Sequence, residues 1–188
     1  MSNFSDVIKN GSIVWRIDAR DRILSKESAP ESWTRLGGRA LVARILVDEV
    51  PGTCEPLGQF NKLLFTPWLL VGHMLSSCDR ISVGGKSPLT GGVKEANAGG
   101  TTGLILAYLG IKALIIENKP VDRGLWVLHL SNQGASFDRA DELAGMGVYS
   151  AAPRLIERYG EKIAIAIIGP GGEMRMATAG IQNLDKEK

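Results

Sequence analysis

The feature that most restricts what this sequence can fold into is a glycine-rich segment over residues 80–103. Seven of its 24 residues are glycines, and three adjacent pairs recur within it: Gly84-Gly85, Gly91-Gly92 and Gly99-Gly100. Glycine lets backbone N–H groups approach a ligand closely, although it costs roughly 0.5–1 kcal/mol inside a helix or strand. Arg80, Lys86 and Lys94 add positive charge. The segment therefore favours a cradle for phosphate or another flat, oxyanion-rich ligand, with tight turns alone as the alternative interpretation.

The two familiar nucleotide-binding loops do not account for this segment. A P-loop would need a glycine five residues before Gly85, where Arg80 stands, and Pro88 follows where its helix should begin. The dinucleotide pattern G-x-G-x-x-G is also absent, since Gly169-Pro-Gly171 has Met174 at the third glycine position. The predicted anion cradle must therefore be of another kind.

Charge and cysteine content exclude several classes of protein. The 188 residues carry 22 basic and 20 acidic side chains, which argues against nucleic acid or an anionic membrane as the main partner. Two cysteines and two histidines supply neither the four thiolates of an iron–sulfur cluster nor a zinc-ligand spacing. The first residues lack a signal-peptide pattern, and the apolar runs over 63–75 and 104–116 are too short to cross a bilayer. We expect a reduced, soluble, cytoplasmic protein with no membrane or nucleic-acid partner.

Hydrophobic periodicity and turn residues predict strands and helices in irregular alternation. Strands are expected over 13–17, 22–24, 62–66, 80–83, 113–117, 125–130 and 163–168, the last of them buried on both faces. Helices are expected over 39–50, 104–109 and 150–158, the third with Ser150 as its cap, and a turn is expected over 169–172. We see no clean tandem repeat. Because no regular βαβ rhythm emerges, the pattern favours an α+β fold.

A series of motifs resembles the N-terminal domain of the tungsten-containing aldehyde ferredoxin oxidoreductase family. The motifs are Leu36-Gly-Gly-Arg39, Asp48-Glu-Val-Pro51, Asn61-Lys-Leu-Leu64, Arg80, Lys86-Ser-Pro-Leu-Thr-Gly-Gly92, Ala96-Asn-Ala-Gly-Gly100, Gly110-Ile-Lys-Ala-Leu-Ile-Ile-Glu117 and Ala166-Ile-Ile-Gly-Pro-Gly-Gly-Glu173. The Lys-Ser-Pro-Leu-Thr-Gly-Gly string followed by Asn-x-Gly-Gly is highly specific. The resemblance runs from the first hairpin to about Asn183.

The resemblance implies two pseudo-symmetry-related β-sheets that form a saddle with a few helices, on which a tungsten (or molybdenum) bis-pyranopterin cofactor rests. In the family, the arginine matching Arg80 contacts a pterin phosphate, and the asparagine matching Asn97 supports a magnesium ion that bridges the pterin phosphates. The glycine matching Gly99 contacts the pterin through its backbone. With the basic, glycine-rich pattern, this gives the candidate cofactor-binding residues Arg39, Arg80, Lys86, Ser87, Asn97, Ala98, Gly99 and Gly100, with Asn97 as the metal residue and no catalytic residue. Arg39 is either a second phosphate contact or only a surface charge.

Some positions depart from the family pattern. Ala40 and Ala98 stand where the family usually has glycine and serine, and Pro67-Trp-Leu-Leu-Val71 replaces a small-residue passage. Thr101-Thr102 replaces aromatic residues. The family continues into a second cofactor segment and two helical domains that carry the cluster cysteines and the acid/base groups, whereas the sequence given ends at Lys188. We therefore expect a single domain over 1–188 without those helical domains and without an iron–sulfur cluster of its own.

Two functions are consistent with this pattern. The first is the cofactor-binding part of an oxidoreductase that converts an aldehyde to a carboxylate and passes electrons to an iron–sulfur acceptor, with ferredoxin reached indirectly. Such a chain is expected to be inactive alone and to need a separate chain that carries the iron–sulfur cluster and the substrate pocket, or to form a homodimer. The second is a non-catalytic remnant or a pterin-binding accessory protein of the same fold.

Overall fold

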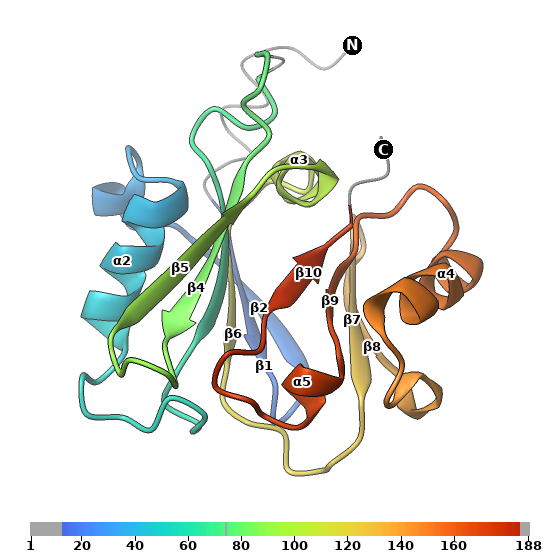
Figure 1. The fold of residues 1–188 in the computed structure, drawn as a ribbon. Coiled ribbons are helices and arrows are strands. Elements are labelled where there is room, and N and C mark those ends of the chain that lie inside the picture. The colour runs from blue at the N-terminus through green and yellow to red at the C-terminus, as the bar shows by residue number, and fades with distance from the viewer. Residues whose placement is uncertain (1–12, 74, 185–188) are drawn as a thin grey trace.

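The fold is built around a six-stranded sheet, seen in the middle of the computed structural model (Figure 1), which describes residues 13–73 and 75–184. The strands lie in the order β2-β1-β6-β3-β4-β5. Their bounds are β1 Ile13–Asp18, β2 Ile23–Ser28, β3 Leu63–Pro67, β4 Ile81–Lys86, β5 Val93–Ala98 and β6 Ile111–Glu117. Strands β1 and β6 run parallel, and the other neighbouring pairs are antiparallel. The five strands predicted in this region are confirmed, and β5 is an additional one.

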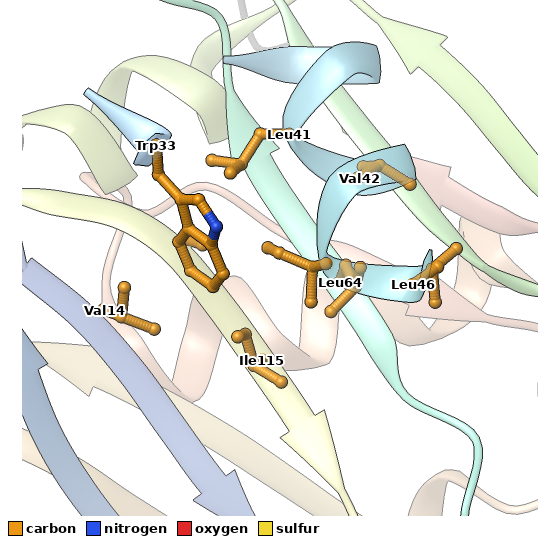
Figure 2. Packing of buried hydrophobic residues seen from close by; sticks show 9 residues of the cluster. Val14, Trp33, Leu41, Val42, Leu46, Leu64 and Ile115 are labelled. Atoms are coloured by element: carbon orange, nitrogen blue, oxygen red, sulfur yellow. The ribbon is translucent and has the colours of Figure 1, made fainter. Parts of the chain in front are cut away.

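One face of the large sheet is covered by helix α2 (Gly38–Glu49), which confirms the helix expected there. Its apolar side chains recur at helical spacing and are fully buried at Leu41, Val42 and Ile45. Figure 2 shows Trp33, from the short 3₁₀ helix η1 (Glu31–Trp33), lying between Leu41 of the helix and Ile115 of the sheet. This cluster fixes α2 against the large sheet and so holds the strands of that sheet in place.

The opposite face of the large sheet packs against helix α3 (Thr101–Tyr108) and against strands from the second half of the chain. Side-chain alternation in β1 directs Trp15 and Ile17 to this face and Val14 to the α2 face. Helix α3 begins three residues earlier than predicted. It is followed by Gly110 at φ +74°, in the left-handed conformation expected of a glycine that ends a helix.

Two small sheets form the next layer, and helix α4 covers them on the outside (Figure 1). The first pairs β7 (Trp126–Ser131) with β8 (Gly134–Arg139), and the second pairs β9 (Ala166–Ile168) with β10 (Ile181–Asn183). Helix α4 (Val148–Tyr159) packs on them through Ala152 and Leu155, which cluster with Ile165. The layers are therefore α2, the large sheet, the small sheets and α4.

Three predictions in the second half were wrong in detail. Ser150 lies inside α4, because the backbone N–H of Ser150 already bonds to the carbonyl of Gly147, the residue that caps the helix. The apolar run 163–168 contributes only the three residues of β9 to a strand, and Ile168 is 42% exposed. A two-stranded sheet with α4 on one side cannot bury both faces of that run. The turn expected over 169–172 is a single-turn helix, α5 (Pro170–Glu173).

The order of elements in the first half is repeated in the second. The first series is β1, β2, η1, α2, β3 and β4, and the second is β7, β8, η2 (Asp141–Leu143), α4, β9 and β10, with α5 added between β9 and β10. Both long helices have 12 residues and begin after a glycine, Gly37 or Gly147. In each half an antiparallel strand pair follows the helix. The two halves thus share one order of elements, although the sequence shows no clear repeat.

The fold class is α+β, as predicted, with one large sheet and few helices. Among residues 13–73 and 75–184, no helix is long and apolar enough to cross a membrane.

Candidate functional site

A groove with a volume of about 1410 Å³ lies between the large sheet and the small sheet β9–β10. Strands β3, β4 and β5 line it on one side, and residues 179–183 line it on the other. The start of α3 closes part of its wall at Gly100, Thr101 and Thr102. The glycine-rich segment therefore folds mainly into the β4–β5 hairpin, and its last residues turn into α3 beside the groove.

Most of the residues selected from the sequence line this groove. These residues are Arg80, Lys86, Ser87, Asn97, Ala98, Gly99 and Gly100. Arg39 is the exception, since its guanidinium donates to the Glu95 carboxylate at 2.9 Å and its side chain is 73% exposed. Glu95 also accepts a hydrogen bond from the hydroxyl of Ser82, which in turn accepts one from the Trp68 indole. This chain of bonds joins the hairpin to the start of α2 rather than to the groove.

Arg80 and Asn97 contact each other at the groove. Arg80 lies directly before β4, and Asn97 is next to last in the edge strand β5. The Arg80 Nη1 donates to Asn97 Oδ1 at 3.0 Å, and Asn97 Nδ2 donates to the carbonyl of Ile81 at 3.3 Å. The Asn97 side chain thus points toward Arg80, and both ends of its amide are hydrogen-bonded.

The turn from β5 into α3 is shaped to leave space beside Arg80. Gly100 has φ +93°, which favours glycine, and a Cβ added to Gly99 would lie 3.9 Å from Arg80 Nη1. No side chain caps the start of α3. The hydroxyl of Thr101 is buried there and has no hydrogen-bond partner within the described part of the chain. Helix N-termini carry partial positive charge and free N–H groups, so this corner can accept an anion.

Asn183 holds this turn from the opposite side of the groove. Its Nδ2 donates to the carbonyl of Gly99 at 2.6 Å, and its Oδ1 accepts a hydrogen bond from the hydroxyl of Thr102. Asn183 belongs to β10, so the small sheet is fastened to the start of α3. Asn183 and Thr102 are not among the residues selected from the sequence, because neither lies in a motif that shows which strand it will face.

Lys86 and Ser87 line the groove, but their polar groups bond to nearby loops. Lys86 Nζ donates to the carbonyls of Gly52 and Cys54 at 2.5 and 2.6 Å. The Ser87 hydroxyl accepts from the backbone N–H groups of Leu89 and Thr90 at 3.2 Å each, which stabilises the hairpin turn. In this arrangement both side chains organise the loops around the groove.

The three glycine pairs are present for different physical reasons. A Cβ on Gly84 would lie 2.3 Å from Val42 Cγ1, and one on Gly85 would lie 2.7 Å from the Lys62 carbonyl. The first pair is therefore required by packing. Gly91, at φ +73° with open space around it, serves the hairpin turn, and the third pair lies beside Arg80. The alternative interpretation, tight turns alone, thus holds for the Gly91-Gly92 pair, whereas close packing inside β4 accounts for Gly84-Gly85 and was not predicted. The ligand cradle remains the prediction for Gly99-Gly100.

The charge of the groove suits an anion. Five basic residues line it against the single aspartate Asp79: Lys62, Arg80, Lys86, Lys94 and Lys119. Lys94 and Lys119 have no ion-pair partner among the described residues. With the buried Thr101 hydroxyl and the open face of Gly99, this arrangement fits a phosphate group. In residues 13–73 and 75–184 no group of three or more His, Cys, Asp or Glu residues could hold a metal ion.

The magnesium role expected of Asn97 has less support from this geometry. Its Oδ1, the atom that would ligate the ion, accepts a hydrogen bond from the permanently charged Arg80. A divalent cation on that oxygen would lie next to a fixed positive charge. Magnesium ligation by this side chain stays a prediction that the arrangement does not favour.

Comparison with known proteins relates the chain to one family. The family model described as "Aldehyde ferredoxin oxidoreductase, N-terminal domain" matches residues 14–188. Two proteins named tungsten-containing aldehyde ferredoxin oxidoreductase are similar to it. The one from Pyrococcus furiosus is 32% identical over 158 residues, 84% of this chain and 26% of that protein. The one from Thermococcus kodakarensis is 33% identical over 161 residues, again 84% and 26%.

A solved structure has the same fold. A chain of the active site complex BamBC of benzoyl coenzyme A reductase, in complex with 1,5-dienoyl-CoA, matches with a TM-score of 0.86 and 29% identity. The match covers 92% of this chain and 27% of that chain. The present chain therefore spans about a quarter of the length of the relatives that it matches.

Proposed function

Because this chain belongs to the aldehyde ferredoxin oxidoreductase family through its N-terminal domain, we propose that its groove holds the phosphate end of a tungsten- or molybdenum-pterin cofactor. The observation that carries this proposal is the convergence of Arg80, the Gly99-Gly100 turn and the unpartnered Thr101 hydroxyl at one corner of a basic groove. When bound, the metal-pterin supplies the redox chemistry. The residues of this chain bind and orient it.

Each group at this corner has a distinct task in the proposal. Arg80 donates charge-assisted hydrogen bonds to a phosphate oxygen, which are stronger than neutral ones. Gly99 has no side chain beside the guanidinium of Arg80, so a flat ring system can approach its backbone. The start of α3 adds partial positive charge, and Thr101 offers a hydroxyl donor. Lys94 and Lys119 attract the anion over a longer range.

For the complete enzyme we propose the activity that the relatives' names indicate. An aldehyde and a water give a carboxylate, three protons and two electrons, and the electrons pass to ferredoxin through an iron–sulfur cluster. The cluster and the substrate pocket would lie in polypeptide beyond the quarter that this chain represents.

A patch beside the glycine-rich hairpin supports docking of further polypeptide. Trp68, Leu69 and Leu70 are consecutive residues that are 43%, 48% and 51% exposed. Contiguous exposed apolar groups of this kind mark interaction surfaces. The family usually has small residues at these positions, so the larger side chains would change how the further polypeptide packs here.

Titration with inorganic pyrophosphate tests the anion site without a partner. Isothermal titration calorimetry of the whole chain should give saturable binding that weakens as salt is added. Arg80→Ala should weaken it by about ten- to a hundredfold, because a hydrogen bond to a charged group contributes roughly 1.5–3 kcal/mol. Arg44→Ala is the matched control, since it removes an exposed charge from the outer side of α2.

Equal affinities of the wild type and the Arg80→Ala variant would overturn the assignment of the groove. A parallel measurement uses the chain purified from a host that makes molybdopterin and is supplied with tungstate or molybdate. Pterin fluorescence after oxidative release should be retained in the Arg44→Ala protein and lost from the Arg80→Ala protein. Retained pterin without aldehyde oxidation in any co-expressed assembly would favour the accessory role over the enzyme.

A further inference from the structure

The side chain of Asn97 is hydrogen-bonded to Arg80, the residue proposed to contact the anion. We propose that Asn97 is a positioning residue, which holds the Arg80 guanidinium at the rim of the groove beside Gly99 and does not ligate a metal through its side chain. The inference rests on the proposed function, since it assigns to Asn97 a role in the same anion site. It follows from three features of the pair.

The first feature is that the orientation of the Asn97 amide is set by the backbone. Its Nδ2 donates to the carbonyl of Ile81 at 3.3 Å, which leaves Oδ1 facing the Arg80 guanidinium at 3.0 Å. The register of the hairpin, with Asn97 opposite Ser82 and Ala98 opposite Ile81, places the amide directly across from the start of β4. The amide therefore bridges the carbonyl of Ile81, the first residue of β4, and the side chain of Arg80, the residue before it.

The second feature is that the acceptor is uncharged. Arg80 makes no ion pair among the described residues, although its side chain is long and exposed. A guanidinium has five N–H donors, and the amide oxygen uses one of them while leaving the full positive charge. A carboxylate at position 97 would hold the guanidinium equally well but would cancel that charge.

The third feature is the space left on the other side of the guanidinium. A Cβ on Gly99 would lie 3.9 Å from Nη1 and 4.0 Å from Cζ of Arg80. Asn97 on one side and the bare backbone of Gly99 on the other thus leave an open approach to the remaining donors. A guanidinium that is already oriented loses less freedom when the anion binds, and this raises affinity.

The positioning role and the metal-ligand role predict opposite results for Asn97→Asp. Magnesium prefers oxygen ligands, so a ligating carboxylate would strengthen magnesium-dependent binding. If Asn97 positions Arg80, the carboxylate pairs with the guanidinium and weakens anion binding. Asp is close in shape to Asn, so the substitution also disturbs the hairpin little.

The experiment measures pyrophosphate affinity of the full chain by calorimetry, first with EDTA and then with magnesium. We expect Asn97→Ala to bind several-fold more weakly and Asn97→Asp at least about tenfold more weakly, with or without magnesium. In an Arg80→Ala background, Asn97→Ala should have no further effect, because Asn97 acts through Arg80. Thermal unfolding of each variant confirms that the fold is retained.

The possible failures can be told apart. Unchanged binding in Arg80→Ala would contradict the proposed function itself. Weakened binding in Arg80→Ala with unchanged binding in Asn97→Ala, additive effects in the double variant, or tighter magnesium-dependent binding in Asn97→Asp would overturn the positioning role alone. A second readout needs no ligand: the Nε–Hε group of Arg80 should show a lower heteronuclear NOE in Asn97→Ala than in the wild type. An unchanged value would also count against the positioning role.

Discussion

The guanidinium of Arg16 faces the carboxylate of Glu49 across two hydrogen bonds, each 2.8 Å long. Arg16 lies in β1 and Glu49 is the last residue of α2, so the pair fastens the end of the helix to the large sheet. Lys62 and Glu117 extend it into a network whose two basic side chains are only 17% and 14% exposed. Bidentate pairs with this little exposure are stronger than ordinary surface ion pairs.

Replacing Glu49 by Gln should lower the free energy of unfolding at pH 7 by about 2 kcal/mol, because Arg16 loses its bidentate acceptor while it stays largely buried and keeps only Glu27 and Glu117. Urea unfolding followed by circular dichroism measures the change. Asp48→Asn is the matched control, since Asp48 pairs with Arg44 one turn back on the exposed side of α2 and should cost less than about 0.5 kcal/mol. Equal losses in the two variants would contradict the special role of the Arg16 network.

The same pair predicts how stability depends on pH. Burial alone would raise the pKa of Glu49, but hydrogen bonds and the charges of Arg16 and Lys62 outweigh it and hold the pKa below its ordinary value of 4.5. The unfolded chain therefore takes up this proton at a higher pH than the folded chain. The stabilisation is fully present above pH 4.5 and is lost as the pH falls through the lower folded value.

Urea unfolding of the wild type and of Glu49→Gln between pH 3 and about pH 7 tests this linkage. Stability of the wild type should fall more steeply below pH 4.5 than that of the variant, so the two curves converge in acid. Parallel curves would show that Glu49 does not carry the dependence.

Two glycines of the same segment should respond differently to alanine. Gly84→Ala places a methyl group 2.3 Å from Val42 Cγ1 and 2.9 Å from the Lys94 carbonyl, so overpacking should lower the unfolding free energy by about 1–3 kcal/mol. Gly99→Ala meets only Arg80, at 3.9 Å, and should leave the melting temperature nearly unchanged. Its effect should instead be weaker pyrophosphate binding. A stable Gly84→Ala protein, or undiminished binding by Gly99→Ala, would contradict this division of roles.

Asn183 should contribute to both stability and anion binding, because it joins β10 to the turn before α3. Asn183→Asp removes the donor to the Gly99 carbonyl, so we expect a loss of about 1 kcal/mol in stability and several-fold weaker pyrophosphate binding. Gln182→Glu, at the neighbouring and exposed position, adds the same charge to the same strand without breaking that bond. By calorimetry, Asn183→Asp should bind pyrophosphate more weakly than Gln182→Glu, and by urea unfolding it should have the lower free energy of unfolding. If the two variants behave alike, the added charge and not the lost bond is the cause.

The large sheet and α2 could be predicted because their residues follow simple local rules. Alternation in β1 and helical spacing of apolar residues between Leu41 and Leu46 each describe one buried face. The predictions for Ser150 and for the run 163–168 were wrong for a different reason. Whether a serine caps a helix depends on where the backbone turns, and an apolar run is buried only as far as its neighbours cover it. Neither condition is local.

The candidate site shows the same limit. The sequence brought Arg80, Asn97 and Gly99 together because they lie in one continuous segment that folds back as a hairpin. It could not separate them from Arg39, which bonds to Glu95 on the α2 side. It also could not find Asn183, which reaches Gly99 from 84 residues away. Contacts between distant segments have to be read from the structure.

The doubled order of elements makes positions in the two halves correspond. Arg80 directly precedes β4 and Gly180 directly precedes β10, so the two residues hold corresponding places in the two halves. A shared order of elements fixes where a backbone position recurs, but it does not fix which side chain stands there. In this protein one such pair of positions carries an arginine in the first half and a glycine in the second, so a charged anchor is present at one place and absent at its counterpart.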